Sequence, residues 1–413
     1  MTDPCFDKSP GLTTVDEAVD LLLKQAPVVR ESEELLLTEA LHRVLAKEII
    51  STVDVPPADN SAMDGYAVAL SDINTGGETC IPVSQRIAAG DSGSRLQPGT
   101  AARIFTGAPV PEGADAVVMQ EQCEIKGEHV CLAKRPKDGE NIRRAAEDIN
   151  KGDAILYSGI ELRPQDLGLA ASVGCARVSV HRKIKVALFS TGDELTEPGT
   201  PLASGKIYNS NRYILNTWLA ALECDVLDMG IIKDDMQVTR RALKDAAGQA
   251  DIIISSGGVS VGEEDYVKAA LETLGELSLW RVAMKPGKPL AMGKIGNTPF
   301  LGLPGNPVST FVTFALFARP FIRTMQGIRN TRPRALPATA MFDWPKSGKR
   351  REYIRARRVQ GDDNQLQIEI YPRQGSGVLT STCWAEGLVE IREGTTVSQG
   401  DTVLYTPFSE LIS

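Results

Sequence analysis

The chain has 413 residues and a formal net charge of −8, with 42% hydrophobic and 24% charged residues, an ordinary composition for a globular protein. No apolar run approaches the roughly 20 residues that cross a bilayer, no basic and apolar leader suggests export, and the acidic balance argues against general nucleic-acid binding. We therefore expect a cytoplasmic protein of about two to four domains, in which a local cluster of cations holds any anionic ligand.

The seven cysteines and three histidines restrict the metal chemistry. The cysteines are scattered and odd in number, and no pair has the CxxC spacing of a zinc or redox site. The histidines show no paired ligand spacing, which argues against a histidine-based transition-metal site. We expect reduced, mostly buried thiols.

Two helices are predicted near the beginning of the chain. Thr14 and Glu17 form a capping-box pair, followed by apolar residues at helical spacing. Thr38 is a candidate cap for a second helix carrying Leu41 and Val44.

The next segment is predicted to be mainly β. Residues 54–68 (DVPPADNSAMDGYAV) read as a loop that leads into a strand. Short apolar runs separated by Gly, Pro and Asp then predict a compact β domain to about residue 160. Residues 163–174 predict a short helix, with Pro164 in its first turn and Gly174 just past its end.

From about residue 184, strands and helices alternate, as in parallel βαβ units whose sheet is covered on both faces. Strands are expected at 185–190, 225–232, 251–256, 278–284 and 298–303, and helices at 209–222, 238–247, 265–274 and 307–322. A last β region begins near residue 331, where 352–359 and 365–372 alternate with period two. Ligands of such α/β sheets bind beyond the carboxyl ends of the strands.

The loop SSGGVSVGEEDY, residues 255–266, has the most ligand-binding features. Gly257 and Gly258 would let the backbone approach a ligand closely, and the carboxylates of residues 263–265 would lie where a divalent cation meets phosphates. A glycine turn followed by an acidic helix start is the alternative interpretation.

Two further loops offer cations and a helix start. In KPGKP, prolines and a glycine fix Lys285 and Lys288 on a rigid turn, which suits an anion clamp, although a solvated turn would look similar. In GLPGNPVS, Asn306 is the candidate cap and Pro307 the first helical residue, as a purely structural turn would also have.

Acidic loops follow the first two strands of the α/β region and contain Glu194 and Asp234. Each alone is also explained by ordinary turn chemistry. Five such loops on one sheet edge together predict a site for a phosphate-bearing anion, with Mg²⁺ held by carboxylates. The residues alone do not identify the reaction.

These motifs resemble the molybdopterin molybdenumtransferase (MoeA) family of molybdenum insertases, which includes the E domain of gephyrin. The resemblance covers almost the whole chain and comprises DNSAMDGYAV at 59–68, RIFTGAPVPEGADAVVMQE at 103–121, NIRRAAEDI at 141–149, ALFSTGDEL at 187–195, IIKDD at 231–235, SSGGVSVGEEDY at 255–266, KPGKP at 285–289, LPGNPVS at 303–309 and GSGVLTS at 375–381.

The resemblance implies an α/β multidomain fold. It implies a central three-layer α/β domain with a parallel sheet, like that of molybdopterin adenylyltransferases, an N-terminal discontinuous α+β region, an inserted β domain and a C-terminal β-barrel. The boundaries would be 1–50 with 145–182 for the discontinuous domain, 51–144 for the inserted domain, 183–330 for the α/β domain and 331–413 for the barrel. Family members are homodimers whose active site lies between the α/β domain of one subunit and the inserted domain of the other.

The function implied is insertion of molybdenum from molybdate into adenylylated molybdopterin, with release of AMP and Mg²⁺ as cofactor. The catalytic positions carried over are Asp64, Glu194, Asp234 and Asp265, of which Asp234 and Asp265 would hold the metal. The substrate-binding positions are Thr106, Ser256, Gly257, Gly258, Arg281, Lys285, Lys288, Pro304, Asn306 and Pro307. The molybdate positions are Lys285, Lys288, Arg355 and Ser376.

Two departures from the family pattern affect this interpretation. Arg281 stands where many members carry Lys, which keeps the charge and changes its geometry. Ala146 replaces the glycine of the usual GED motif, so the local backbone would differ if that glycine needs a positive φ.

Two other functions remain open. The same fold clusters receptors in gephyrin, which suggests a scaffold, and the α/β domain alone could serve a molybdopterin adenylyltransferase. Besides the substrates and a second copy of the chain, the resemblance implies a molybdopterin adenylyltransferase and recipient molybdoenzymes as partners, with neither nucleic acid nor membrane.

Overall fold

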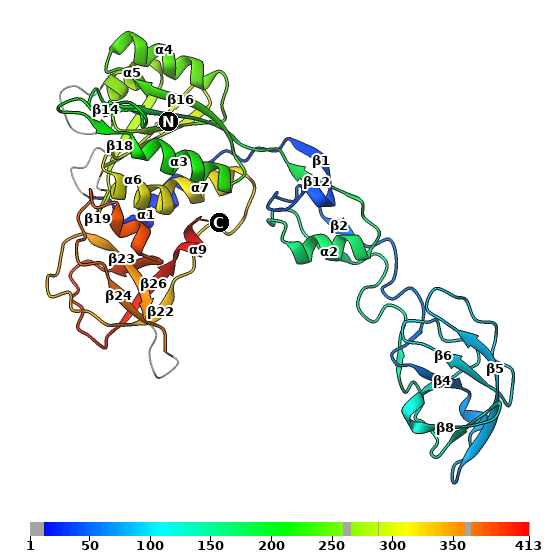
Figure 1. The fold of residues 1–413 in the computed structure, drawn as a ribbon. Helices are drawn as coiled ribbons and strands as arrows, with labels where there is room; N and C mark the ends of the chain where they lie inside the picture. Colours follow the sequence, from blue (N-terminus) through cyan, green and yellow to red (C-terminus); the bar gives the residue numbers. More distant parts are fainter. Residues whose placement is uncertain (1–11, 259–265, 288, 360–364, 413) are drawn as a thin grey trace, which may run out of the picture. The chain divides into compact units, whose positions relative to one another are not determined.

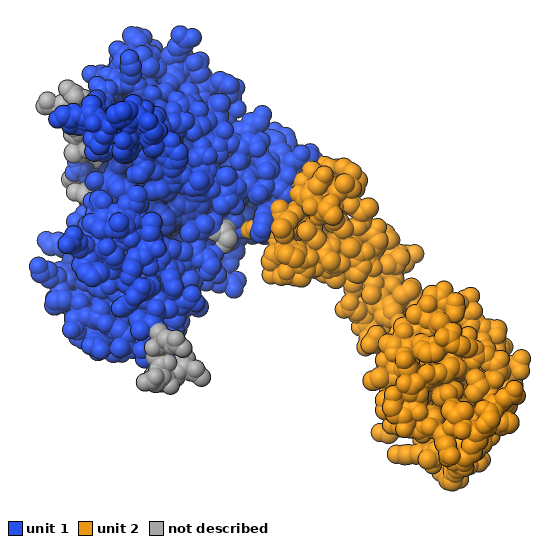
Figure 2. Space-filling model, in the orientation of Figure 1, with its two compact units in different colours: residues 1–33, 42–46, 181–413 blue, residues 34–41, 47–180 orange. Residues whose placement is uncertain are grey.

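The computed structural model describes residues 12–258, 266–287, 289–359 and 365–412, shown as a ribbon in Figure 1. The chain forms two compact units (Figure 2). Unit 1 comprises residues 1–33, 42–46 and 181–413, and unit 2 comprises 34–41 and 47–180. Within the described residues, no helix is both long and apolar enough to cross a membrane.

The first predicted helix is confirmed and the second is wrong. Helix α1 (Val15–Lys24) is capped by Thr14, whose side chain and backbone complete the capping box with Glu17. No helix carries Leu41 and Val44: strand β1 (Ser32–Leu36) leads into a short 3-10 turn, η1 (Leu37–Glu39), and the described residues 40–48 are not helical. The backbone of Leu37 donates to Ala176 at 3.3 Å, so tertiary pairing outweighs the local helical pattern.

Unit 2 contains a six-stranded sheet of order β7-β4-β6-β5-β9-β8. Its strands are β4 (Gly65–Val68), β5 (Thr79–Ile87), β6 (Ala101–Ile104), β7 (Ala116–Met119), β8 (Cys123–Lys126) and β9 (His129–Leu132). Smaller pairs are made by β2 (Ile49–Ile50) with β11 (Ala154–Leu156), β3 (Asn60–Ser61) with β10 (Ile142–Arg143), and β1 with β12 (Arg177–His181). The predicted β domain is thus confirmed.

Two local predictions in unit 2 can be compared with the backbone. Helix α2 (Pro164–Ser172) begins with Pro164, and Gly174 follows it at φ +84°, as predicted. Ala146 has φ +60°, in the left-handed region that favours glycine, so the alanine at this position still adopts that conformation.

The expectation of reduced, mostly buried thiols is wrong in both respects: one pair forms a disulfide, and of the four free cysteines among the described residues only Cys224 is buried. Cys80 and Cys131 lie directly opposite each other on the antiparallel strands β5 and β9 and form a disulfide. The sequence spacing does not predict this disulfide, because the two cysteines are 51 residues apart and are brought together only by strand pairing. Elsewhere, burial raises the pKa of the Cys224 thiol to about 12, which makes it unreactive.

The central sheet of unit 1 has six strands in the order β16-β13-β17-β21-β20-β18. They are β13 (Lys185–Thr191), β16 (Asp225–Ile232), β17 (Ile252–Ser256), β18 (Glu276–Arg281), β20 (Pro289–Ile295) and β21 (Thr298–Leu303). The first four strands in this order are parallel, as predicted. Beyond them, β20 pairs antiparallel with β21, and β18 pairs antiparallel with β20.

Helices cover both faces of this sheet, so the predicted three-layer domain is confirmed. Alternate residues of β13 separate the two cores: Val186 and Leu188 pack with one cluster, Ala187 and Phe189 with the other. The first cluster includes α3 (Ser210–Ala221), α6 (Pro307–Thr313), a π-helical turn η4 (Phe314–Ala318) and α7 (Arg319–Met325). The second includes α4 (Met236–Ala247) and α5 (Tyr266–Leu274).

The C-terminal strands close into the predicted barrel. β23 (Arg351–Val359), β24 (Gln367–Ile370), β22 (Leu336–Ala340), β26 (Thr402–Pro407) and β25 (Gly387–Ile391) pair in that order, and β25 pairs back to β23. The short strand β19 (Met284–Lys285) from the α/β domain adds to β23. The helices α8 (Thr380–Trp384) and α9 (Phe408–Ile412) complete this region.

Candidate functional site

A cavity of about 670 Å³ lies beyond the carboxyl ends of the parallel strands. Its walls come from the loops that follow β13, β16, β17 and β21, from the turn between β19 and β20, and from two loops of the barrel. This is the edge where the sequence predicted a site, because the ends of parallel strands meet there.

The glycine turn after β17 is packed too closely for any side chain. Gly257 and Gly258 have φ of +90° and +67°, a region that L-residues rarely adopt. A Cβ on Gly257 would lie 2.7 Å from the carbonyl oxygen of Thr191, and one on Gly258 would lie 2.8 Å from the Thr191 hydroxyl. The backbone of this turn is therefore part of the cavity wall.

The turn between β19 and β20 has a similar constraint. Gly287 has φ +101°, and a Cβ there would lie 2.4 Å from the hydroxyl oxygen of Thr313, a buried atom with no hydrogen-bond partner in the described residues. Lys285 precedes this turn, and its ammonium group lies 3.0 Å from a carboxylate oxygen of Glu352. About half of the Lys285 side chain stays exposed, so its remaining N–H groups can reach a ligand.

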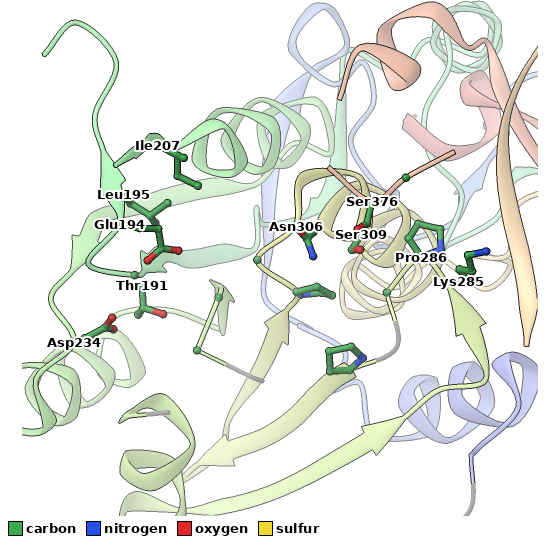
Figure 3. A pocket seen from close by; sticks show the side chains of 18 of the residues that line it. Thr191, Glu194, Leu195, Ile207, Asp234, Lys285, Pro286, Asn306, Ser309 and Ser376 are labelled. Atoms are coloured by element: carbon green, nitrogen blue, oxygen red, sulfur yellow. The ribbon is translucent and has the colours of Figure 1, made fainter. Parts of the chain in front are cut away.

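The cavity has an acidic and a basic end. In Figure 3, Glu194 and Asp234 lie beside Thr191 at one end, and Lys285 lies beside Pro286 at the other. The Asp234 carboxylate accepts a 3.1 Å hydrogen bond from the backbone of Asp193. Carboxylates at one end and a cation at the other suit a ligand that combines a metal-bound portion with free anionic charge.

The barrel supplies the wall formed by Gln374, Gly375 and Ser376. The carbonyl of Ser376 accepts a 3.0 Å bond from Val308 at the start of α6, which joins the barrel loop to the α/β domain. Behind this wall, Arg355 is 1% exposed and donates to carbonyl oxygens of Tyr353 and Gly375.

Arg355 is a buried cation whose described partners are all neutral. Burial lowers the pKa of its guanidinium to about 10, which still leaves it positively charged at neutral pH. Because no carboxylate neutralises it among the described residues, its field reaches the nearby wall of the cavity.

Asp64 and Thr106 meet in unit 2. One carboxylate oxygen of Asp64 accepts both the backbone N–H and the hydroxyl of Thr106, each at 2.8 Å. These bonds, the backbone one first, together with the charge of Arg103, hold the pKa of the Asp64 carboxyl below its usual range. Two predicted site residues that are 42 positions apart are thus joined locally.

The predicted positions can now be placed. Those that line the cavity are Glu194, Asp234, Gly257, Gly258, Lys285, Pro304, Asn306 and Ser376. Ser256 is buried directly before the glycine turn, and the lining does not include Arg281, Pro307 or Arg355. Asp265 and Lys288 lie outside the described residues.

Sequence reasoning missed several lining residues. Leu195 and Ile207 extend the wall near Glu194, and Gln374 extends the barrel wall. Arg350 also lines the cavity; in the sequence it belongs to the basic run of residues 349–358, which suits a bound anion but which period-two alternation divides between two faces.

Together these features define a multidomain protein with a candidate small-molecule site at the strand ends of an α/β domain. Three family models match the chain: the MoeA N-terminal region (domain I and II) at residues 13–174, a "probable molybdopterin binding domain" at 187–324, and the MoeA C-terminal region (domain IV) at 337–408.

Individual relatives agree with these matches. The molybdopterin molybdenumtransferase of Haemophilus influenzae is 41% identical over 408 residues, covering 97% of this chain and 100% of the relative. That of Bacillus subtilis is 35% identical over 376 residues, with 88% and 87% coverage. The crystal structure of the molybdopterin biosynthesis MoeA protein from Pyrococcus horikoshii has a TM-score of 0.83 at 28% identity and covers 96% of this chain and 100% of its own. The chain belongs to the molybdopterin molybdenumtransferase family.

Proposed function

We propose that this protein inserts molybdenum from molybdate into adenylylated molybdopterin, releasing AMP and forming the molybdenum cofactor. The observation that carries the proposal is the convergence of five α/β loops and two barrel loops on a single cavity of about 670 Å³. This volume falls within the roughly 300–1,000 Å³ that is usual for small-molecule sites. Family membership supplies the substrate class.

The phosphate-bearing part of the substrate would lie along the glycine turn, where the backbone of Gly257 and Gly258 can approach it closely. Asp234 would hold Mg²⁺ at the acidic end, beside Glu194 and together with substrate phosphates, and hard carboxylate ligands fit this ion. When bound, Mg²⁺ would polarise the phosphoanhydride and neutralise charge on the departing AMP. Asp265, which lies outside the described residues, is proposed from the sequence alone as the second Mg²⁺ ligand.

Molybdate is a dianion and needs positive charge near the dithiolene. Lys285 and Arg350 line the basic side of the cavity, and Ser376 offers a hydroxyl there. Arg355 would contribute through its charge behind Gly375 rather than by lining the cavity. Lys288 is proposed from the sequence alone.

Incubation of the protein with adenylylated molybdopterin and Mg²⁺ tests the proposal. AMP should appear only when molybdate is added, and a chelator of Mg²⁺ should stop its release. A molybdopterin adenylyltransferase would instead consume ATP with free molybdopterin, and a scaffold would catalyse neither reaction. Molybdate-independent AMP release, or none with all components present, would refute insertion.

Asp234→Asn, with Asp245→Asn as control, tests the carboxylate end. Asp234 lines the cavity in the loop that precedes α4, whereas Asp245 is exposed within α4 itself. We expect Asp234→Asn to lose at least about 10²-fold in turnover, since an electrostatic partner of the reacting charges is typically worth that much. Asp245→Asn should stay within twofold of the parent, and equal losses in both variants would remove Asp234 from the proposal.

We also propose that the protein acts in the cytoplasm as a homodimer, receiving substrate from a molybdopterin adenylyltransferase and delivering cofactor to molybdoenzymes. The support is its family membership. Sedimentation of the purified protein tests the dimer, and a monomer at micromolar concentration would contradict it.

A further inference from the structure

Asn211 lies behind the cavity, in the first turn of α3. The residue is 8% exposed. The amide nitrogen Nδ2 donates to the hydroxyl of Ser256 at 2.8 Å and to the carbonyl oxygen of Gly305 at 2.7 Å. One amide group thus joins the end of β17 to the loop after β21.

The orientation of this amide is fixed by chemistry. The carbonyl of Gly305 can only accept a hydrogen bond, so the NH₂ group of Asn211, not its oxygen, must face it. The oxygen Oδ1 is buried and has no hydrogen-bond partner in the described part of the chain. A buried polar atom without a partner lowers the stability of the fold, so the two hydrogen bonds from Nδ2 are formed while Oδ1 remains unsatisfied.

The two groups that Asn211 holds are both next to cavity walls. Ser256 immediately precedes Gly257, and Gly305 lies between Pro304 and Asn306. The two walls also touch: the backbone of Gly257 donates to Leu303 at 3.1 Å, and a Cβ on Gly305 would lie 4.0 Å from the Cα of Gly257. A shift of either wall therefore changes the position of the other.

We infer that Asn211 is a positioning residue, which sets the spacing between the glycine turn at 257–258 and the turn at 304–306. This inference rests on the proposed function for its catalytic consequence. The residue does not line the cavity, so it acts through the backbone groups that do. Misplacement of such groups by about 1 Å costs on the order of 10²-fold in rate.

Three variants of α3 test the role. Asn211→Ala removes both hydrogen bonds, and Asn211→Asp keeps the shape while placing an acceptor oxygen against the Gly305 carbonyl. Asn216→Ala is the matched control, because Asn216 lies on the same helix and donates at 3.0 Å to Asp228, a residue that does not line the cavity.

We expect kcat/KM for AMP release to fall about 10²-fold in Asn211→Ala, mainly through kcat, and further in Asn211→Asp. Asn216→Ala should remain within twofold of the parent. All assays are made at a temperature where circular dichroism shows each variant to be folded. Parental kcat in Asn211→Asp, or a loss in Asn216→Ala equal to that in Asn211→Ala, would overturn the inference.

Hydrogen exchange without substrate separates this inference from the proposed function. The peptides covering 252–258 and 303–309 should exchange faster in Asn211→Ala than in the parent or in Asn216→Ala. If the parent released no AMP, the proposed function would fail while exchange still decided the role of Asn211. Unchanged exchange in both peptides would refute the positioning role whatever the activity.

Discussion

The cavity of unit 1 and the Asp64 loop of unit 2 hold their polar groups in different ways. At the cavity, the shape of the turn is imposed by neighbouring strands, since a Cβ on Gly257 would lie 2.7 Å from the Thr191 carbonyl oxygen. In unit 2, the Asp64 carboxylate accepts two hydrogen bonds from Thr106. The residue after Thr106, Gly107, has φ +81°, and a Cβ there would meet no described atom within 4 Å apart from its chain neighbours.

The two loops therefore differ in what a side chain at the glycine would disturb: the local backbone conformation in both, and the packing of a neighbouring strand in only one. Both glycines have positive φ and would be strained by any L side chain. Only Gly257 would in addition force backbone atoms of another strand to move. A close-packed interior cannot yield locally, so the cavity should tolerate change far less than the Asp64 loop.

The largest effect is expected from Gly257→Ala. Positive φ costs about 1–3 kcal/mol for a non-glycine residue, and overpacking against Thr191 adds about 1–3 kcal/mol. We expect unit 1 to lose about 2–6 kcal/mol in free energy of unfolding, measured from denaturant midpoints, and kcat/KM for AMP release to fall by more than about 10²-fold. A variant as stable and active as the parent would show that the turn is free to relax.

A smaller effect is expected from Gly107→Ala. Here the left-handed backbone is strained but no neighbour is displaced, so the cost should be about 1 kcal/mol. The same denaturant titration, followed by a probe in unit 2, measures it. A loss as large as that of Gly257→Ala would show that crowding is not what distinguishes the two loops.

The sequence predicts the cavity well where adjacent residues follow a parallel strand. The loops of Glu194, Asp234 and Gly257 could be assigned to one edge because strand polarity alone brings such loops together. Antiparallel β20 was not predicted as a strand, since PLAMG reads only as an apolar segment between two turns. The apolar pattern of this segment predicts that it is buried, but it does not predict a strand or the direction in which that strand runs.

Contacts between distant elements could not be predicted. Arg350 and Gln374 reach the cavity because the barrel closes beside it, and nothing in their own segments specifies that packing. Asn211 reads in sequence as an ordinary residue of a helix start, and its bonds to Ser256 and Gly305 span 45 and 94 positions. The helix wrongly predicted after Thr38 is also explained by a distant contact, because β1, directly before it, pairs with β12, which lies more than a hundred residues away in the sequence.

The smallest effect concerns the local hold on Asp64. Its lowered pKa means that the stability contributed by the carboxylate is present above the unfolded pKa and is lost as pH falls through the folded one. Thr106→Val removes the hydroxyl donor and keeps the backbone donor, so the pKa of Asp64 should rise toward its usual value and the loss should begin at higher pH. Carboxyl-carbon NMR titration of the full chain measures this directly, with Thr106→Ser as the variant that keeps the hydroxyl. An unchanged pKa in Thr106→Val would mean that the backbone N–H of Thr106 and the charge of Arg103 suffice, and that the loop, like the cavity, fixes its carboxylate through the main chain.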